Sequence, residues 1–227
     1  MRRVVLLVSL LVAAVLASQA ATCSSGSLAS YIALGSGGCS IGNNTLFDFH
    51  PLAGSAGNTE ISPSSVTITP LGGSLNPGLM ISLHVSSPPP FGSNELMFNY
   101  NVAGTSYVGE VMTLSGASEP PDGGVTDTVN YCEKGTFNST GVLGCPGVTG
   151  GTSLVDGILN TDAFTFHSPY FLSLTDDLVI TAGAAAPASG ATLIDQLRSV
   201  PEPASYWITA LGILVVLGAK MRSLRHA

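Results

Sequence analysis

The chain has 227 residues, a formal net charge of −7, 9% charged residues, 27 glycines and 14 prolines. Nucleic-acid binding needs a basic surface that neutralises phosphates, so this acidic composition argues against a nucleic-acid partner. The low content of charged residues and the many glycines and prolines argue against a coiled coil or long helical bundle, and 45% hydrophobic residues argue against full disorder.

The first 20 residues are typical of a secretory signal peptide. A basic start is followed by an uncharged apolar run over residues 4–17. Small residues stand at the −3 and −1 positions of the predicted cleavage site, which follows Ala20. We therefore expect residues 1–20 to direct export through the inner membrane, and residues 21–199 to form one exported domain.

The predicted domain is strongly acidic, because its only lysine or arginine side chains are Lys134 and Arg198. Such a surface repels anionic polysaccharides and nucleic acids unless divalent cations bridge them.

Four cysteines, Cys23, Cys39, Cys132 and Cys145, all lie in the exported part. An even number in an oxidising compartment predicts two disulfides, for which three pairings are possible. We favour the two local pairs in sequence order, because they close the shortest loops, and each would contribute about 3 kcal/mol. The cysteines lack C-x-x-C spacing and a nearby histidine, so we predict no metal site at them.

The domain is expected to open with a short helix. Ser27 is a good N-cap residue, and Leu28, Tyr31 and Ile32 share one helical face. Gly35 would end the helix.

Beyond this helix the sequence predicts mainly β-strands. Polar and apolar residues alternate most clearly over 79–86 and 96–102, which is typical of half-buried strands. In a similar run over 125–131, the acidic Asp127 interrupts the apolar face. Further strands are expected at 67–69, 108–114, 163–166, 171–174 and 178–181. Residues 191–198 fit a last strand or a short helix, and we favour the strand.

Glycine and proline clusters predict the turns between these strands, at 72–73, 76–78, 88–90, 120–124 and 147–151. The neighbouring acids Asp176 and Asp177 suit a solvated turn between two strands. Eight to ten short strands with such turns predict an antiparallel β-sandwich.

The last 28 residues have three parts. A Pro-rich motif comes first, residues 204–219 form an uninterrupted apolar run, and a basic tail closes the chain over 220–227. Sixteen helical residues span about 24 Å, slightly less than a hydrocarbon core of about 30 Å. The basic tail predicts a transmembrane helix with its C-terminal end in the cytosol. The motif is Val200, Pro201, Glu202 and Pro203, and the tail carries Lys220, Arg222 and Arg225.

This three-part ending resembles the PEP-CTERM sorting signal of Gram-negative bacteria that make exopolysaccharide. The resemblance implies recognition by exosortase, a membrane-embedded protease, with cleavage near the Pro-Glu-Pro motif, and an association with exopolysaccharide. Pro201 and Pro203 fit this role physically, because they keep their preceding residues extended and so leave the motif accessible as a protease substrate.

The search for catalytic motifs is negative, so we predict no catalytic residues and no enzyme activity. His50, His84 and His167 are the only histidines of the domain, and neither G-x-S-x-G nor H-E-x-x-H occurs. We predict no cofactor, with Ca²⁺ as a minor alternative. The acids considered for Ca²⁺ are Asp122, Asp127, Asp156, Asp162, Asp176 and Asp177.

We therefore expect an exported, non-enzymatic protein of the cell surface or extracellular matrix, held in the inner membrane until its C-terminal signal is processed. A carbohydrate-binding or adhesive module on the same route is the main alternative. Its candidate sugar-stacking residues are Phe91, Tyr107, Phe137 and Tyr170, although packing in the core explains such aromatics more simply. An extracellular hydrolase and a permanent single-pass membrane protein are further alternatives.

Overall fold

The computed structural model describes residues 20–104, 106–118, 122–138 and 141–199. The predicted signal peptide up to residue 19, the sorting motif, the predicted membrane helix and the basic tail lie outside these ranges. Within them, no helix is long and apolar enough to cross a membrane.

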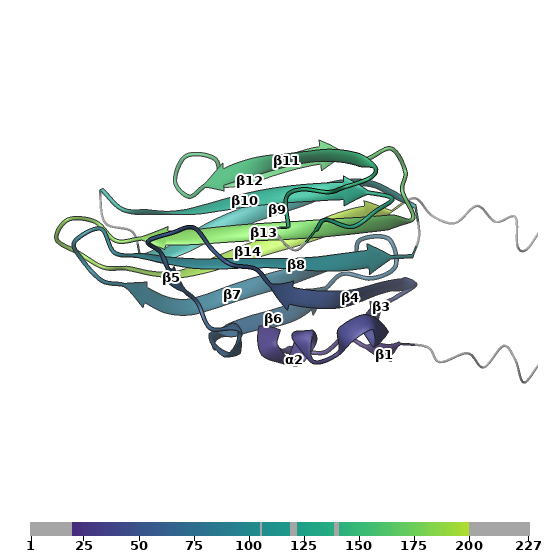
Figure 1. The fold of residues 1–227 in the computed structure, drawn as a ribbon, viewed down its shortest axis with the longest axis horizontal. Helices are drawn as coiled ribbons and strands as arrows, with labels where there is room; N and C mark the ends of the chain where they lie inside the picture. The colour runs from purple at the N-terminus through teal and green to yellow at the C-terminus, as the bar shows by residue number, and fades with distance from the viewer. Residues whose placement is uncertain (1–19, 105, 119–121, 139–140, 200–227) are drawn as a thin grey trace, which may run out of the picture.

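Two β-sheets stack on each other in a jelly-roll-like sandwich, in which nearly all neighbouring strands are antiparallel (Figure 1). Sheet A has the order β1-β3-β4-β8-β13-β10-β11, and β5 joins it by pairing with β8. Its strands are β1 (Ala21–Thr22), β3 (Cys39–Ile41), β4 (Asn44–Pro51), β5 (Thr59–Glu60), β8 (Ser93–Ala103), β10 (Gly124–Glu133), β11 (Val148–Val155) and β13 (Phe171–Thr181).

Sheet B has the order β12-β9-β14-β7-β6-β2. Its strands are β2 (Gly26–Ser27), β6 (Val66–Leu71), β7 (Gly78–Ser87), β9 (Tyr107–Ser118), β12 (Thr161–Thr165) and β14 (Ala188–Ser199). The predicted β-sandwich is thus confirmed, with more strands than expected. The strand predicted at 191–198 is confirmed as part of β14.

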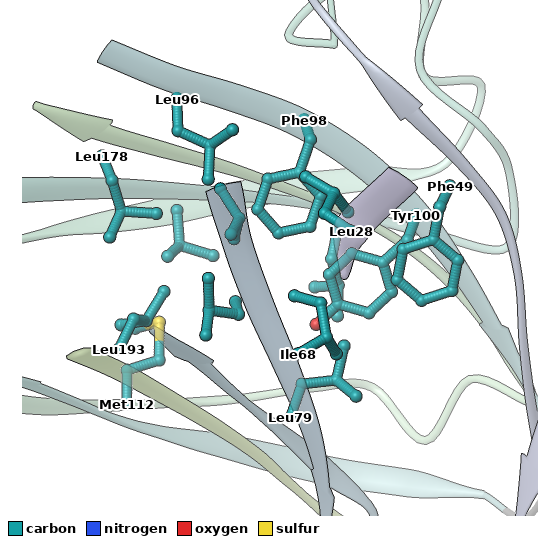
Figure 2. Close-up of a cluster of buried hydrophobic side chains, with 14 of the residues drawn as sticks. Leu28, Phe49, Ile68, Leu79, Leu96, Phe98, Tyr100, Met112, Leu178 and Leu193 are labelled. Atoms are coloured by element: carbon teal, nitrogen blue, oxygen red, sulfur yellow. The ribbon is translucent and has the colours of Figure 1, made fainter. Parts of the chain in front are cut away.

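Alternation along the strands places the core between the sheets. On β8 the side chains of Leu96, Phe98 and Tyr100 point inward and are buried. They meet residues of sheet B such as Leu79 and Leu193, as Figure 2 shows. Burying large apolar side chains on both inner faces is what holds such sheets together.

The predicted helix is confirmed as α2 (Leu28–Ile32). The Ser27 hydroxyl accepts a hydrogen bond from the Ser30 backbone N–H at 3.2 Å, as an N-cap does. Leu28 and Tyr31 are buried against the core, and a 3₁₀ turn over Gly35–Gly37 follows.

Two predicted turns are wrong. Asp176 and Asp177 lie in the middle of β13, where the strands predicted at 171–174 and 178–181 form one continuous strand. The glycines at 147–151 mostly belong to β11, where Gly150 pairs with Tyr131 of β10. A side chain at Gly150 would collide with the Tyr131 ring, so glycine here allows close packing within a strand.

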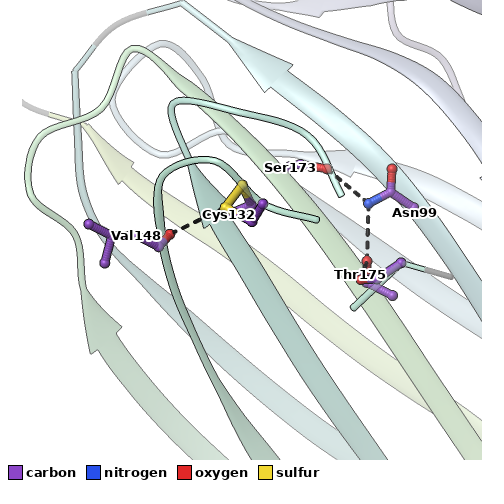
Figure 3. The surroundings of a disulfide bond; sticks show 7 residues. Asn99, Cys132, Val148, Ser173 and Thr175 are labelled. Atoms are coloured by element: carbon purple, nitrogen blue, oxygen red, sulfur yellow. Dashed lines mark hydrogen bonds between the residues drawn. A yellow bond between two sulfur atoms is a disulfide. The ribbon is translucent and has the colours of Figure 1, made fainter. Parts of the chain in front are cut away.

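Both favoured disulfides are present. Cys23 is bonded to Cys39, and Cys132 is bonded to Cys145. Figure 3 shows the second bond at the end of β10, beside the loop that leads into β11.

Candidate functional site

A pocket of about 380 Å³ opens on the outer face of sheet A. Its floor lies on strands β4 and β8, and its rim comes from two loops that lie far apart in the sequence. The lining residues are Gly35, Asp48, Phe49, His50, Asn99, Asn101, Thr136 and Phe137.

A bulge in β4 shapes one wall of the pocket. The register between β4 and β8 shifts between Phe47 and His50, and Asp48 has a φ of 52°. Aspartate is one of the few residues that tolerate this left-handed conformation, and bulges commonly redirect side chains at functional sites. His50 Nδ1 lies 3.0 Å from the Asp48 carbonyl oxygen, while Phe49 turns inward and stacks on Tyr100.

Two asparagines of β8 form the floor. Asn99 is held rigidly, because its Nδ2 lies within 3.0 Å of Ser173 Oγ, the Leu174 carbonyl oxygen and Thr175 Oγ1, as Figure 3 shows in part. The Asn101 amide nitrogen donates to Asp48 Oδ2 at 3.5 Å. Asn101 is only 4% exposed, and its Oδ1 has no hydrogen-bond partner among the described residues.

An orphaned amide oxygen is costly in a buried position, since a polar atom loses its water without gaining a donor. Asn101 is one of the residues that line the pocket, so a rotation of its amide would turn this oxygen toward a ligand donor.

Each disulfide anchors one side of the rim. The Cys23–Cys39 bond closes the segment that carries Gly35, and the Cys132–Cys145 bond closes the loop that carries Thr136 and Phe137. The second loop is also tied to the sheet, because the Thr175 hydroxyl donates to the Gly141 carbonyl oxygen at 2.6 Å.

The pocket combines polar groups with one partly exposed aromatic ring. A carboxylate, an imidazole, two amides and a hydroxyl surround the partly exposed Phe137, and neither Lys134 nor Arg198 is among the lining residues. Such a lining can exchange several hydrogen bonds with a ligand and pack against its apolar surface. The nearby carboxylate disfavours an anionic ligand.

The three histidines lie in different places. His50 lines the pocket, and His84 lines a larger groove of about 450 Å³ on the outer face of sheet B. His167 is exposed, and its Nδ1 lies 3.1 Å from Glu133 Oε1. The groove around His84 contains none of the described buried oxygens that lack a partner, which distinguishes it from the pocket on sheet A.

The candidate aromatic residues are also separated. Phe137 lines the pocket, whereas Tyr107 is buried and donates its hydroxyl hydrogen to Asn44 Oδ1 at 2.9 Å. Phe91 and Tyr170 are exposed and do not line the pocket.

The structure does not assemble the calcium candidates into a metal site. Asp156 accepts hydrogen bonds from the Gly116 backbone and the Asn160 amide, and Asp122 accepts one from the Ala184 N–H. Among the described residues, no group of three or more His, Cys, Asp or Glu side chains could hold a metal ion. Asp127 and Asp176 are buried, and Asp177 lies on the opposite face of β13 from Asp176.

Sequence reasoning missed the main pocket residues, Asp48, Asn99 and Asn101. One signal was present, because two asparagines occupy alternate positions on the polar face of a strong strand. The bulge that brings Asp48 beside them had no such signal.

No family model matches the chain, and no curated protein matches it either. Among solved structures, the chain is similar to the carbohydrate-binding module TmCBM61 in complex with β-1,4-galactotriose. The identity is 10%, the coverage is 70% of this chain and 83% of the other, and the TM-score is 0.24. It is also similar to a cupin-2 domain from Rhodospirillum rubrum, at 9% identity, 68% and 76% coverage and a TM-score of 0.19. At these TM-scores neither similarity bears on the function of this chain.

Proposed function

We propose that this chain is an exported surface or matrix protein of the PEP-CTERM class, and that its β-sandwich binds a neutral saccharide in the pocket on sheet A. Saccharides carry many hydroxyl groups and an apolar ring face. The pocket offers matching groups, since Asp48, Asn99 and Asn101 supply polar atoms and Phe137 supplies a ring.

The observation that carries the binding proposal is Asn101 Oδ1, which is buried at the pocket floor without a donor. A sugar hydroxyl in the pocket would satisfy it once the Asn101 amide turns toward the cavity. The hydrogen bonds that fix Asn99 and the disulfides that close the two rim loops keep the site preorganised, which lowers the entropic cost of binding. The proposal is for binding without chemical conversion of the saccharide.

The export route rests on different observations. Two disulfides suit an oxidising compartment outside the cytosol. The predicted signal peptide supports secretion, and Val200, Pro201, Glu202 and Pro203 support sorting by an exosortase-like protease. Exopolysaccharide of the same cell is then the nearest source of saccharide.

Binding is tested by calorimetric titration with neutral oligosaccharides prepared from the producer's exopolysaccharide. We expect Asn101→Ala and Phe137→Ala each to weaken binding at least tenfold, because each removes a different part of the site. Asn43→Ala is the matched control, since Asn43 is exposed in the β3–β4 turn outside the pocket lining. Equal affinity in wild type and both pocket variants would disprove the proposed site.

Sorting is tested by mass spectrometry of the mature protein recovered from the cell surface. We expect a C-terminus near the Pro-Glu-Pro motif. Recovery of surface protein that still carries Lys220, Arg222 and Arg225 would contradict processing.

A further inference from the structure

Four acidic side chains interrupt the apolar inner faces of the sandwich. Asp127 of β10 and Asp176 of β13 come from sheet A, and Glu110 of β9 and Asp195 of β14 come from sheet B. Each is at most 1% exposed. Acidic residues are almost never fully buried unless they are paired with a cation or a metal.

The strand registers place these acids as two diagonal pairs. Asp127 is opposite Leu178, two residues from Asp176, and Asp195 is opposite Met112, two residues from Glu110. The carboxyl groups of Glu110 and Asp195 are close enough to share a hydrogen bond when one of them carries a proton. The hydroxyl of Tyr100, on β8, donates to Asp195 Oδ2.

No cation faces this cluster among the described residues. Lys134 and Arg198 are exposed, and the ion pair between His167 and Glu133 involves none of the four acids. The other titratable groups near the four acids are Tyr100 and Asp177. The neighbouring inward side chains of β6, β7, β8 and β11 are apolar, namely Ile68, Leu79, Ile81, Leu96, Phe98 and Leu154.

Most carboxyl oxygens of the four acids lack a hydrogen-bond partner among the described residues. Both oxygens of Glu110, Asp127 and Asp176, and Oδ1 of Asp195, are buried without a hydrogen-bond partner among the described residues. Four unpaired carboxylates cannot share one apolar interior, because each would lose its hydration and repel the others. A proton on each group removes the charge, which ends the repulsion and greatly reduces the cost of lost hydration.

We propose that the interior of the sandwich is a proton-binding switch: the four carboxyl groups fold as neutral acids, and the two sheets lose cohesion when rising pH removes their protons. Among the described residues, no three of these carboxyl groups come together in a way that would let a metal ion replace the protons.

Electrostatics supports the direction of this effect. Burial raises the pKa of all four carboxyl groups, and repulsion between them adds to the rise for Glu110, Asp127 and Asp176. In the unfolded chain the same groups ionise near pH 4. Above that pH the folded state therefore binds more protons than the unfolded state, so stability is complete below about pH 4 and falls as pH rises.

The test is urea unfolding of the full chain in non-ionic detergent with EDTA, at several pH values between 5.5 and 7. Each retained proton lowers the folding equilibrium constant about tenfold per pH unit. We expect the folding equilibrium constant to fall at least a hundredfold per pH unit, which corresponds to two or more protons retained by the folded state. Titration of Asp177, which is not one of the four acids, accounts for a fall of at most tenfold per pH unit. A fall of tenfold or less per pH unit would therefore overturn the proposal.

Asp127→Asn and Asp176→Asn each replace a protonated carboxyl group by a neutral amide that does not titrate. In each variant the folding equilibrium constant should therefore fall about tenfold less per pH unit than in the wild type. Glu60→Gln is the matched control, because Glu60 is exposed at the edge strand β5, and it should leave the pH dependence unchanged. Potentiometric titration of the wild type at pH 6, native against urea-unfolded, counts the retained protons without any variant. Equal proton counts in the two states, or a pH dependence abolished by millimolar Ca²⁺, would overturn the proposal.

Discussion

At the scale of single residues, the pocket depends on groups that are buried but not satisfied. Asn101 has an amide oxygen without a donor, next to Asn99, whose amide nitrogen has three acceptors among its neighbours. The polar character of these positions was visible in the strand alternation. The position of Asp48 beside them could not be predicted, because a single extra residue in a strand leaves no periodic signal in the sequence.

Another residue with a testable role is Gly150, which packs against a ring. A Cβ added at Gly150 would lie 2.5 Å from Tyr131 Oη, and that ring is itself packed against Phe164 and Phe166. We expect Gly150→Ala to lower the free energy of unfolding by about 1–3 kcal/mol through overpacking. Gly37→Ala is the matched control, because a Cβ there meets open space. Urea unfolding measures both, and equal stability of the two variants would contradict this packing.

At the scale of elements, alternation predicted the long strands well, and the errors have a common physical cause. Asp176 and Asp177 looked like a turn because charge is rare in mid-strand. The structure accommodates them by burying one and placing the other on the outer face of β13. The sequence around Asp176 and Asp177 could not distinguish a mid-strand position from a solvated loop, because the burial of an acid depends on strands that lie far away in the sequence.

The loop between β10 and β11 is the element whose contribution is easiest to isolate. The Cys132–Cys145 bond closes it with a sequence separation of 13. We expect the double change Cys132→Ser and Cys145→Ser to reduce stability by about 3 kcal/mol, mainly by freeing the unfolded chain. Because the loop carries Phe137, saccharide binding should weaken as well. Urea unfolding and calorimetry test the two effects separately, and an unchanged free energy of unfolding would contradict the first.

At the scale of the whole molecule, the two disulfides and the bulged strand meet at one place. Cys23–Cys39 and Cys132–Cys145 lie far apart in the sequence, yet each stabilises a loop at the rim of the same pocket. Their local pairing followed from loop length alone. Their shared location could not be predicted, since it depends on strand order in sheet A, where β4 and β10 are separated by β8 and β13.

The most direct test of saccharide binding is a nuclear magnetic resonance titration of the protein with neutral oligosaccharides from the producer's exopolysaccharide. The side-chain amide signals of Asn99 and Asn101 should shift together with the backbone signals of Asp48, His50 and Phe137. Shifts confined to the groove around His84 on sheet B, or no shifts at saturating oligosaccharide, would contradict the assignment of the pocket.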